Sequence, residues 1–456
     1  MTPVRRELRA LWQLAWPLVM TQLGFMMLGV VDTLLLGHLS VEALGASALA
    51  NMWGWGSLAL GMGAVLGMDP LVSQAHGERD AERAALALQR GIVVAVAMSI
   101  PVTAFWALTG PGLVLLGQDP AIAGLAQTYN VIRAPSVVFF LVFTALRSWL
   151  SGRSLVSPAM WVSVFMNVLN LFFGWALIFG RLGLPRLELV GAAWVASLVT
   201  VAQPLLLIWL IRAAKLHDGA WRPWDRRSFE RRGLAQILRL GLPVGVQYSL
   251  EGWAWSFSTM MAGWLGAAAL AGHIIVLNLA SLSFQIPLGI ALAASVRVGN
   301  QIGAADLTGA RRSAAVSLAL GAGVMLAFGL LFATLATDLP RLYSTDAGVT
   351  ALAALVLPIA AAFQLFDGTQ VVAGGILRGA GRTHAPAVVN LIGFWGVSLP
   401  LSWYWAFGDG GGLEGIWWGL VVGLFAVSLA LCSGSGAPCA GRSRSCASAS
   451  TDPRRV

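Results

Sequence analysis

Charged residues are scarce in this sequence. Of its 456 residues, 11% are charged and 57% are hydrophobic, whereas about a quarter of the residues of an ordinary soluble domain are charged. Lysine occurs once, as Lys215. This composition excludes a soluble globular protein and predicts an integral membrane protein, because only a bilayer stabilises so much exposed apolar surface.

Cysteine is equally rare, and several functional motifs are missing. The three cysteines, Cys432, Cys439 and Cys446, lie at or beyond the end of the last apolar run, which excludes a disulfide framework. Lys215 lies between Ala214 and Leu216, so the Walker A motif of an ATP-driven pump is absent. The sequence also lacks HExxH, a paired Cys/His cluster and a GxSxG at the start of an apolar run. We therefore expect neither an enzyme nor a bound cofactor or metal.

Long apolar runs are what the sequence has instead. Each run is long enough to cross a hydrocarbon core, which needs about 20 helical residues. The sequence therefore predicts an all-α protein with twelve transmembrane helices, at residues 11–37, 46–75, 91–109, 131–150, 155–179, 190–211, 240–263, 268–296, 313–336, 348–377, 386–407 and 413–431.

The net charge of +9 is explained by membrane topology rather than by nucleic-acid binding. If the N-terminus is cytoplasmic, all but four of the 29 basic residues fall on the cytoplasmic side. This distribution follows the positive-inside rule, so we expect both termini in the cytoplasm. The four exceptions are Arg133, Arg181, Arg186 and Arg341.

The two halves of the sequence repeat each other at one constant offset. Pairs that match at this offset include Pro17 with Pro243, Gly63 with Gly289, and Gly77 with Gly303. Each half holds six spans, so both begin on the same side and the repeat is parallel. We predict a six-helix N-terminal lobe (1–211), a cytoplasmic linker (212–239), a six-helix C-terminal lobe (240–431) and a low-complexity, disordered tail (432–456).

Four carboxylates lie inside predicted spans. They are Asp32, Asp69, Glu251 and Asp367, and no Lys or Arg lies deep in any span, so we expect them to lack a permanent cationic partner. A charged carboxylate at the bilayer centre costs at least about 2–3 kcal/mol. It must face a wet cavity, take up a proton or pair with a transient cation, which is what an antiporter requires.

We assign cation coupling to Glu251 and Asp367, which lie near the middle of their spans, and to Asp32. For Asp32 the alternative is a carboxylate bonded to a neighbouring hydroxyl such as Thr33. For Asp69 a structural role is favoured, in which it bonds backbone amides freed by Pro70.

Other polar and aromatic residues could line a cavity between the two halves. An aromatic wall beside Glu251 would suit an organic cation through cation–π contacts, although many of the 20 tryptophans must face lipid. Asn278 could equally bridge two helices inside the protein. The candidates are Asn278, Gln247, Trp253, Trp255, Phe363 and Gln22.

Several passages resemble the multidrug and toxic compound extrusion (MATE) family. They are "VDTLLLGHLSVEALGASALA", "MDPLVSQAHGERD", "GLPVGVQYSLEGWAWSF", "ASVRVGNQIGAAD" and "FDGTQVVAGGILRGAGRTHAPAVVN", within a match from about residue 8 to 431. The resemblance implies twelve helices in two lobes of the MATE and MOP-superfamily fold. It also implies a C-lobe cation site at Glu251 and Asp367, with Asp32 as the acid of the first span.

The resemblance implies a secondary multidrug efflux transporter that exchanges organic cations or toxic metabolites for H⁺ or Na⁺ by alternating access. Phe363 stands where NorM-like members often have a tyrosine, which favours H⁺ over Na⁺. We expect a cationic, amphipathic substrate and a monomer in the bacterial inner membrane. The alternatives are a lipid or lipid-linked sugar flippase of the same superfamily, which would need a cationic cavity, and a membrane-embedded hydrolase with an unrecognised site.

Overall fold

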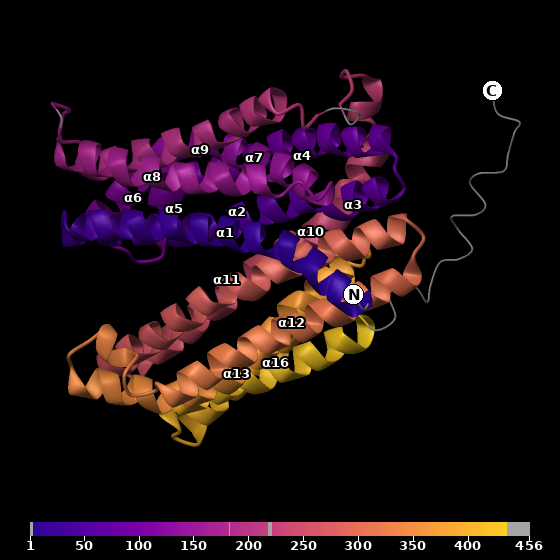
Figure 1. Cartoon of the computed structure of the whole chain (residues 1–456). Coiled ribbons are helices and arrows are strands. Elements are labelled where there is room, and N and C mark those ends of the chain that lie inside the picture. Colours follow the sequence, from indigo (N-terminus) through magenta and orange to yellow (C-terminus); the bar gives the residue numbers. More distant parts are fainter. Residues whose placement is uncertain (1–2, 182, 218–220, 436–456) are drawn as a thin grey trace, which may run out of the picture.

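The chain folds into two groups of helices that meet at one end and separate toward the other (Figure 1). The computed structural model describes residues 3–181, 183–217 and 221–435. We call the end where the groups meet the joined end and the opposite end the splayed end. The joined end carries the start of the first helix, the short helix α3 and the connection between the halves (Figure 1).

The N-terminal group runs from α1 to α9. The bounds of its helices are α1 Pro3–Gly37, α2 Val41–Leu66, α3 Asp69–Gly77, α4 Ala81–Ala107, α5 Thr109–Leu115, α6 Pro120–Arg133, α7 Val137–Gly152, α8 Ser157–Phe179 and α9 Glu188–Ala213, with a 3₁₀ turn η1 at Ala134–Ser136.

The C-terminal group follows the 3₁₀ turn η2 (Arg226–Phe229). It contains α10 Arg231–Trp264, α11 Ala267–Gly303, α12 Leu307–Thr334, α13 Ala347–Gly379, α14 His384–Leu391, α15 Leu399–Trp403 and α16 Gly412–Ser435. A 3₁₀ turn η3 lies at Pro340–Leu342, and the π-helical segments η4 (Ile392–Ser398) and η5 (Tyr404–Gly408) interrupt the eleventh span.

All twelve predicted spans are helical, which confirms the predicted fold class. In the described ranges, eleven helical stretches are long and apolar enough to cross a membrane. The twelfth, α10, has 34 residues but is outside that set, because it carries Gln247, Glu251 and several glycines and serines. The least apolar span therefore holds one of the predicted coupling acids.

Several helices extend beyond their predicted spans, and some cross the predicted domain boundaries. Helix α10 begins at Arg231, inside the segment we predicted as linker. Helix α16 continues to Ser435, so it includes the start of the predicted tail. The remaining tail, 436–456, lies outside the described residues, and the division of the chain into domains stays a prediction.

Repeat-related residues make reciprocal contacts between the groups. A Cβ atom built on Gly77 would overlap the carbonyl oxygen of Asn300, and one built on Gly303 would overlap that of Gln74. Gln74 corresponds to Asn300, and Gly77 to Gly303, at the offset that relates Pro17 to Pro243. The repeat deduced from sequence therefore describes a pseudo-twofold arrangement at the joined end.

Glycines allow the helices of opposite groups to pack backbone against backbone. On α2, Gly63 lies against the backbone of Gly245 on α10, and Gly289 on α11 lies against Val19 on α1. Farther along the same α2–α10 contact, Trp55 lies against Gly252 and Trp253 against Gly56. Small residues that let backbones approach are the usual basis of helix packing in membranes, since lipid removes the hydrophobic drive.

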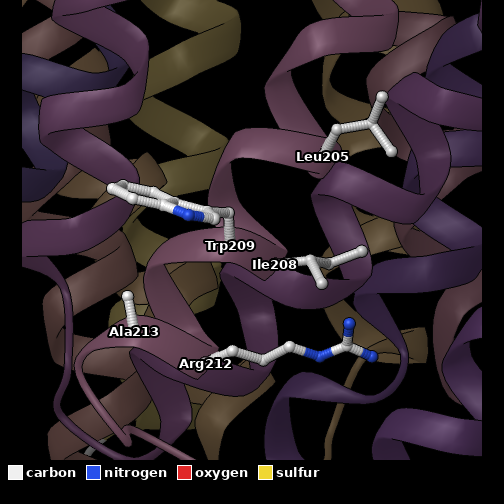
Figure 2. A pocket seen from close by; sticks show the side chains of 5 residues that line it. All are labelled: Leu205, Ile208, Trp209, Arg212 and Ala213. Carbon is white, nitrogen blue, oxygen red and sulfur yellow. The ribbon is translucent and has the colours of Figure 1, made fainter.

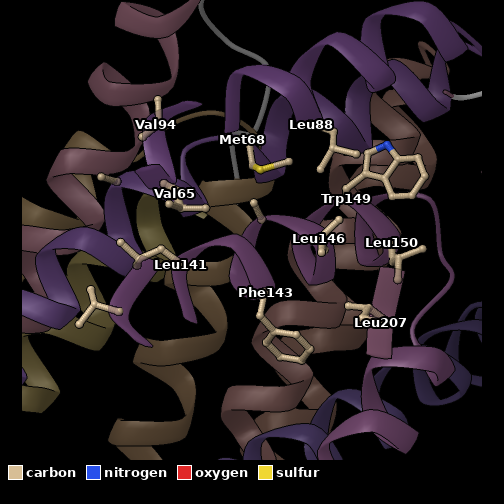
Figure 3. Packing of buried hydrophobic residues seen from close by; sticks show 14 of the residues in the cluster. Val65, Met68, Leu88, Val94, Leu141, Phe143, Leu146, Trp149, Leu150 and Leu207 are labelled. Carbon is tan, nitrogen blue, oxygen red and sulfur yellow. The ribbon is translucent and has the colours of Figure 1, made fainter. Parts of the chain in front are cut away.

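Each group also has its own apolar core. The N-terminal core includes Val65, Phe143, Leu146 and Trp149, which converge from α2 and α7 (Figure 3). The C-terminal core is built from α10, α11, α13 and α16. A third cluster joins α1 to α11, α12 and α13, so the start of α1 packs on the opposite group.

Ion pairs fix the first helix of each half to the opposite half. At the start of α1, Glu7 accepts hydrogen bonds from Arg297 on α11 at 2.9 and 2.7 Å and from Ser313 on α12 at 2.6 Å. At the start of α10, Glu230 pairs with Arg90 on α4 at 2.9 Å. Both anchors lie at the joined end, which they help to hold together.

Candidate functional site

Two glutamine side chains hold Glu251. Its Oε1 atom accepts a hydrogen bond from Gln247 Nε2, one turn earlier on α10, at 2.9 Å and from Gln370 Nε2 on α13 at 3.2 Å. Gln370 also donates to Asn390 Oδ1 at 2.7 Å, and Asn390 donates to the Pro386 carbonyl at 2.9 Å. Because a carbonyl only accepts, this chain fixes the Asn390 and Gln370 amides, with the N–H groups of Gln370 directed toward Glu251.

Asp367 lies on α13, one turn before Gln370, and is 7% exposed. The principal charge acting on it is the carboxylate of Glu251. The structure therefore brings together two acids from distant spans of the sequence. Two carboxylates that interact in a buried place repel, and a proton or a cation relieves that repulsion.

Sequence reasoning missed Gln370 and Asn390. Gln370 follows Asp367 by one helical turn, which places both on one face of a helix. That spacing was the available signal. Asn390 could not be found in this way, because its contact with Gln370 depends on the packing of α14.

Asp32 forms a separate site in the N-terminal group. Its Oδ1 atom accepts a hydrogen bond from Asn170 Nδ2 on α8 at 3.0 Å, and the charge of Arg133 acts on it. The alternative partner, Thr33, instead donates to the Gly29 carbonyl at 2.8 Å. Asp32 therefore has an amide partner on another helix, not the neighbouring hydroxyl.

Two arginines near helix ends are buried between the helices, which contradicts the expectation that the acids inside the spans lack cationic partners. Arg147 on α7 is 6% exposed and Arg378 on α13 is 5% exposed. Arg147 donates to Gln22 Oε1 at 2.8 Å, and Arg378 donates to the Tyr248 hydroxyl at 2.8 Å. We assigned both to cytoplasmic turns from their sequence positions near span ends, which says nothing about how side chains point.

The same arginines correct the interpretation of Asp69. Its side chain lines a small cavity together with Arg147 and Ser148, and the charges of Arg378 and Arg147 act on it. Asp69 therefore has cationic neighbours, and its carboxylate does not accept hydrogen bonds from the backbone amides near Pro70. Asp69, Arg147, Ser148 and Ser151 line a small cavity at the boundary with α11.

The predicted cavity-lining residues occupy different environments. Gln247 donates a hydrogen bond to Glu251, and Gln22 accepts one from Arg147. Trp253 is 52% exposed beside Gly56 of the opposite group. Trp255 packs edge-on against Phe363, and Phe363 packs against Trp417. With 1% exposure, Phe363 belongs to the C-terminal core and lines no open space in this conformation. Asn278 is exposed on α11.

The hydrolase alternative requires a hydroxyl beside a basic nitrogen, and Thr259 and His273 are 3.3 Å apart. However, His273 Nδ1 faces the Trp417 indole N–H at 3.2 Å. Since indole only donates, Nδ1 is the acceptor and Nε2 carries the proton. Nε2 therefore donates to Thr259 and cannot act as its base.

A larger surface pocket lies far from these groups. It follows the end of α9 and is lined by Leu205, Ile208, Trp209, Arg212 and Ala213 (Figure 2). None of the predicted site residues lines it. The predicted acids on α1, α10 and α13 therefore lie outside this pocket.

Comparison with known families matches both halves of the chain. The family model MatE matches residues 17–176 and again residues 243–404. The chain belongs to the MatE family. The two matches coincide with the two halves of the repeat, and they start at residues 17 and 243, the two prolines that the repeat aligns.

Named MatE relatives cover nearly the whole chain. A probable multidrug resistance protein NorM of Pseudomonas putida is 34% identical over 441 residues, 94% of each chain. Multidrug and toxin extrusion protein 2 of mouse is 31% identical over 92% of this chain and 72% of its own length. The crystal structure of the eukaryotic MATE transporter AtDTX14 superposes with a TM-score of 0.86 at 23% identity, covering 94% of this chain and 95% of that one.

Proposed function

We propose that this MatE protein is a proton-coupled exporter of amphipathic organic cations. The named relatives are multidrug resistance and toxin extrusion proteins, which supports export of small molecules. The single observation that carries the coupling is the hydrogen bond from Gln370 on α13 to Glu251 on α10, because it brings Glu251 to the helix face that carries the buried Asp367 one turn earlier. Two neighbouring carboxylates in a membrane interior require a proton or another cation that binds and is released reversibly.

A charge count supports one positive charge per cycle at this site. Three carboxylates, Asp69, Glu251 and Asp367, are linked electrostatically with two guanidiniums, Arg147 and Arg378. One negative charge is left unmatched. A single monovalent cation at the Glu251–Asp367 pair neutralises the group, and so does the positive group of a substrate.

The surroundings of Glu251 favour a proton over Na⁺. A bare Na⁺ needs several oxygen ligands, as hard cations generally do. Gln247 and Gln370 present N–H groups to Glu251 rather than their oxygens. Phe363, at the position of the family's tyrosine, offers no oxygen and is packed in the core. A proton on a carboxylate requires no such shell.

Trp253 supports a cationic substrate. It is half exposed and lies between α10 and α2 of opposite groups, whereas Glu251 faces α13. An exposed aromatic face at the boundary between the groups attracts an organic cation by cation–π contact. Substrate and proton would then compete for the same negative charge, which produces exchange.

Transport would follow from rocking of the two groups about their contact. We place the joined end in the cytoplasm of a bacterial inner membrane, because the arginine-rich segments lie at that end. The structure is then an outward-open state, from which the substrate leaves and a proton enters. A cysteine-accessibility map with a membrane-impermeant reagent tests this orientation, using Ala81→Cys for the joined end and Leu342→Cys for the splayed end.

Proteoliposomes with an imposed gradient test the proposal. We expect efflux of a fluorescent organic cation to follow a pH gradient and to be unaffected by a Na⁺ gradient at constant pH. Glu251→Gln and Asp367→Asn should abolish the response, whereas Glu78→Gln, an exposed acid paired with Arg83, should leave it intact. Wild-type rates in both acid variants would refute the coupling role, and dependence on Na⁺ would replace the proton.

The buried arginines reopen the flippase alternative on one point. Their absence from the spans was the argument against a cationic cavity, and Arg147 and Arg378 are in fact buried. Both, however, interact with Asp69, so their charge is partly neutralised. Transbilayer movement of a fluorescent lipid phosphate in the same vesicles, lost in Arg147→Gln, would favour the flippase over the exporter.

A further inference from the structure

The connection between the two groups is fixed along the N-terminal group and is not a loose tether. We call residues 221–230 the linker segment. Ser228, in the 3₁₀ turn η2, is fully buried and donates a hydrogen bond to Gln89 Oε1 on α4 at 2.7 Å. The amide nitrogen of Gln89 in turn donates to the Arg222 carbonyl at 2.8 Å. One side of the linker segment is therefore held against α4.

This contact lies at the level where α4 is predicted to enter the membrane. The predicted span begins at residue 91, directly after Gln89 and Arg90. Arg90 also holds the linker segment, because it donates to the Arg227 carbonyl at 3.2 and 3.1 Å. The linker segment therefore lies beside α4 at the boundary between hydrocarbon and headgroups, where tryptophan is enriched in membrane proteins.

The opposite side of the linker segment exposes aromatic rings. Trp224 is 47% exposed and Phe229 is 59% exposed, and their ring centroids are 5.9 Å apart. In a 3₁₀ helix, side chains three residues apart lie one above the other. Arg226 therefore shares its side of η2 with Phe229, away from the buried Ser228. Exposed aromatic rings next to arginine are typical of segments that lie on a membrane surface.

The charges around the linker segment are divided between paired acids and unpaired arginines. The acids pair with arginines that face the protein: Glu82 and Asp225 with Arg222, and Glu230 with Arg90 at 2.9 Å. Three further arginines are exposed and form no ion pair among the residues that the structure describes. They are Arg226, Arg231 and Arg232. The exposed surface therefore carries positive charge without a counter-charge.

The end of α9, which leads into the linker segment, has a related arrangement. Trp209 is 61% exposed, and Arg212 follows it by one turn, exposed and without an ion pair within the described ranges. Both line a groove of about 530 Å³ together with Leu205 (Figure 2). Along this face the side chains change from aliphatic to aromatic to cationic over about 10 Å. A phospholipid presents its acyl chain, its interfacial part and its phosphate in the same order.

We propose that this surface binds anionic phospholipids where the joined end meets the bilayer. The aromatic rings lie in the interface, and the arginines bind lipid phosphates through charge-assisted hydrogen bonds. Lipids with a net negative charge are favoured, because clustered arginines next to a membrane are attracted to an anionic surface. We call the following residues the anionic-lipid surface: Arg212, Trp224, Arg226, Phe229, Arg231 and Arg232.

The accessibility of a spin label in nanodiscs tests the proposal. The full chain, with Cys432, Cys439 and Cys446 replaced by serine, would carry one nitroxide at Pro223→Cys, an exposed position of the linker segment outside the anionic-lipid surface. Discs with one protein each would contain phosphatidylcholine alone or with added phosphatidylglycerol. We expect phosphatidylglycerol to lower collisions of the label with a water-soluble nickel complex and to raise collisions with oxygen, because bound lipid covers the linker segment.

Charge variants locate the binding. The combined variant Arg226→Gln, Arg231→Gln and Arg232→Gln should lose the response to phosphatidylglycerol. Arg226→Gln alone should weaken the apparent affinity for this lipid about fivefold, whereas Arg226→Lys keeps the charge and should retain most of it. The matched control is Arg83→Gln, which removes an exposed arginine of the same end that already pairs with Glu78. This control should respond like wild type.

Equal accessibility of the label in neutral and anionic discs would overturn the proposal, and so would a response that survives the triple substitution. Inorganic phosphate, added to the neutral discs, separates a lipid from a soluble anion. Protection of the label by phosphate alone would replace the lipid surface with a soluble-anion site. Because the measurement uses neither substrate nor gradient, its outcome is independent of the proposed transport function.

Discussion

The two halves share an architecture but carry their acids at different places. In the C-terminal group, Glu251 and Asp367 interact, and two glutamines hold Glu251. In the N-terminal group, Asp32 stands with one asparagine and an arginine charge. The repeat equivalents are Phe25 for Glu251 and Ser258 for Asp32. A symmetric scaffold therefore holds an asymmetric charge distribution, as the proposed coupling by the C-terminal group alone requires.

The largest expected effect distinguishes the acids of the two groups. Glu251→Gln should reduce proton-driven efflux by about 10- to 100-fold, because a group that hydrogen-bonds as an ion contributes about 1.5–3 kcal/mol. Asp32→Asn should cost about tenfold or less, since Asn170 can bond an amide as well. Initial rates in proteoliposomes at matched protein density provide the measurement. Equal losses in the two variants would show that the groups share coupling equally.

The amide partners extend the same comparison. Gln370→Leu removes a donor to Glu251 and leaves Asn390 Oδ1 without its partner, so efflux should fall about tenfold. Asn170→Leu, the corresponding change beside Asp32, should cost about threefold or less. Rates across a pH series would check both, with the amount of folded protein fixed by size-exclusion chromatography. A larger loss in the asparagine variant would contradict the dominance of the C-terminal site.

Repeat-related glycines allow a comparison of packing. A Cβ at Gly63 comes within 2.1 Å of the Gly245 backbone, whereas one at Gly289 meets the Val19 side chain at 2.4 Å and the Val19 backbone only at 2.7 Å. Backbone cannot move aside as a side chain can, so Gly63→Ala should be the more destabilising, by about 1–3 kcal/mol. Thermal unfolding in detergent would measure the difference. Identical midpoints for the two variants would mean that both contacts relax equally.

The smallest expected effect concerns the choice between H⁺ and Na⁺ as the coupling ion. Phe363→Tyr places a hydroxyl among Trp255 and Trp417 in the C-terminal core. An unpartnered buried hydroxyl costs about 1–3 kcal/mol, so stability should fall slightly while efflux remains independent of Na⁺. Parallel efflux assays in Na⁺ and choline salts would test whether efflux is independent of Na⁺. A gain of Na⁺ dependence would show that this position reaches the coupling site.

The helices, the repeat and the positions of the acids could be predicted from the sequence for physical reasons. Span length follows from bilayer thickness, and the glycine and proline matches survive because close helix packing depends on them. The arginines were misjudged because Arg147 and Arg378 lie within a turn or two of helix ends, where sequence cannot distinguish a side chain in water from one between helices. The hydrogen bond between Glu251 and Gln370 and the burial of Arg147 and Arg378 depend on tertiary packing, which leaves no periodic signal.

Helix α10 has a consequence for biosynthesis. It falls below the apolarity of every other span, so it gains least from entering lipid during insertion. Its glycines instead fit the backbone of α2, which is synthesised long before α10. The N-terminal group then retains α10 in the membrane by packing against it, and the second half assembles after the first.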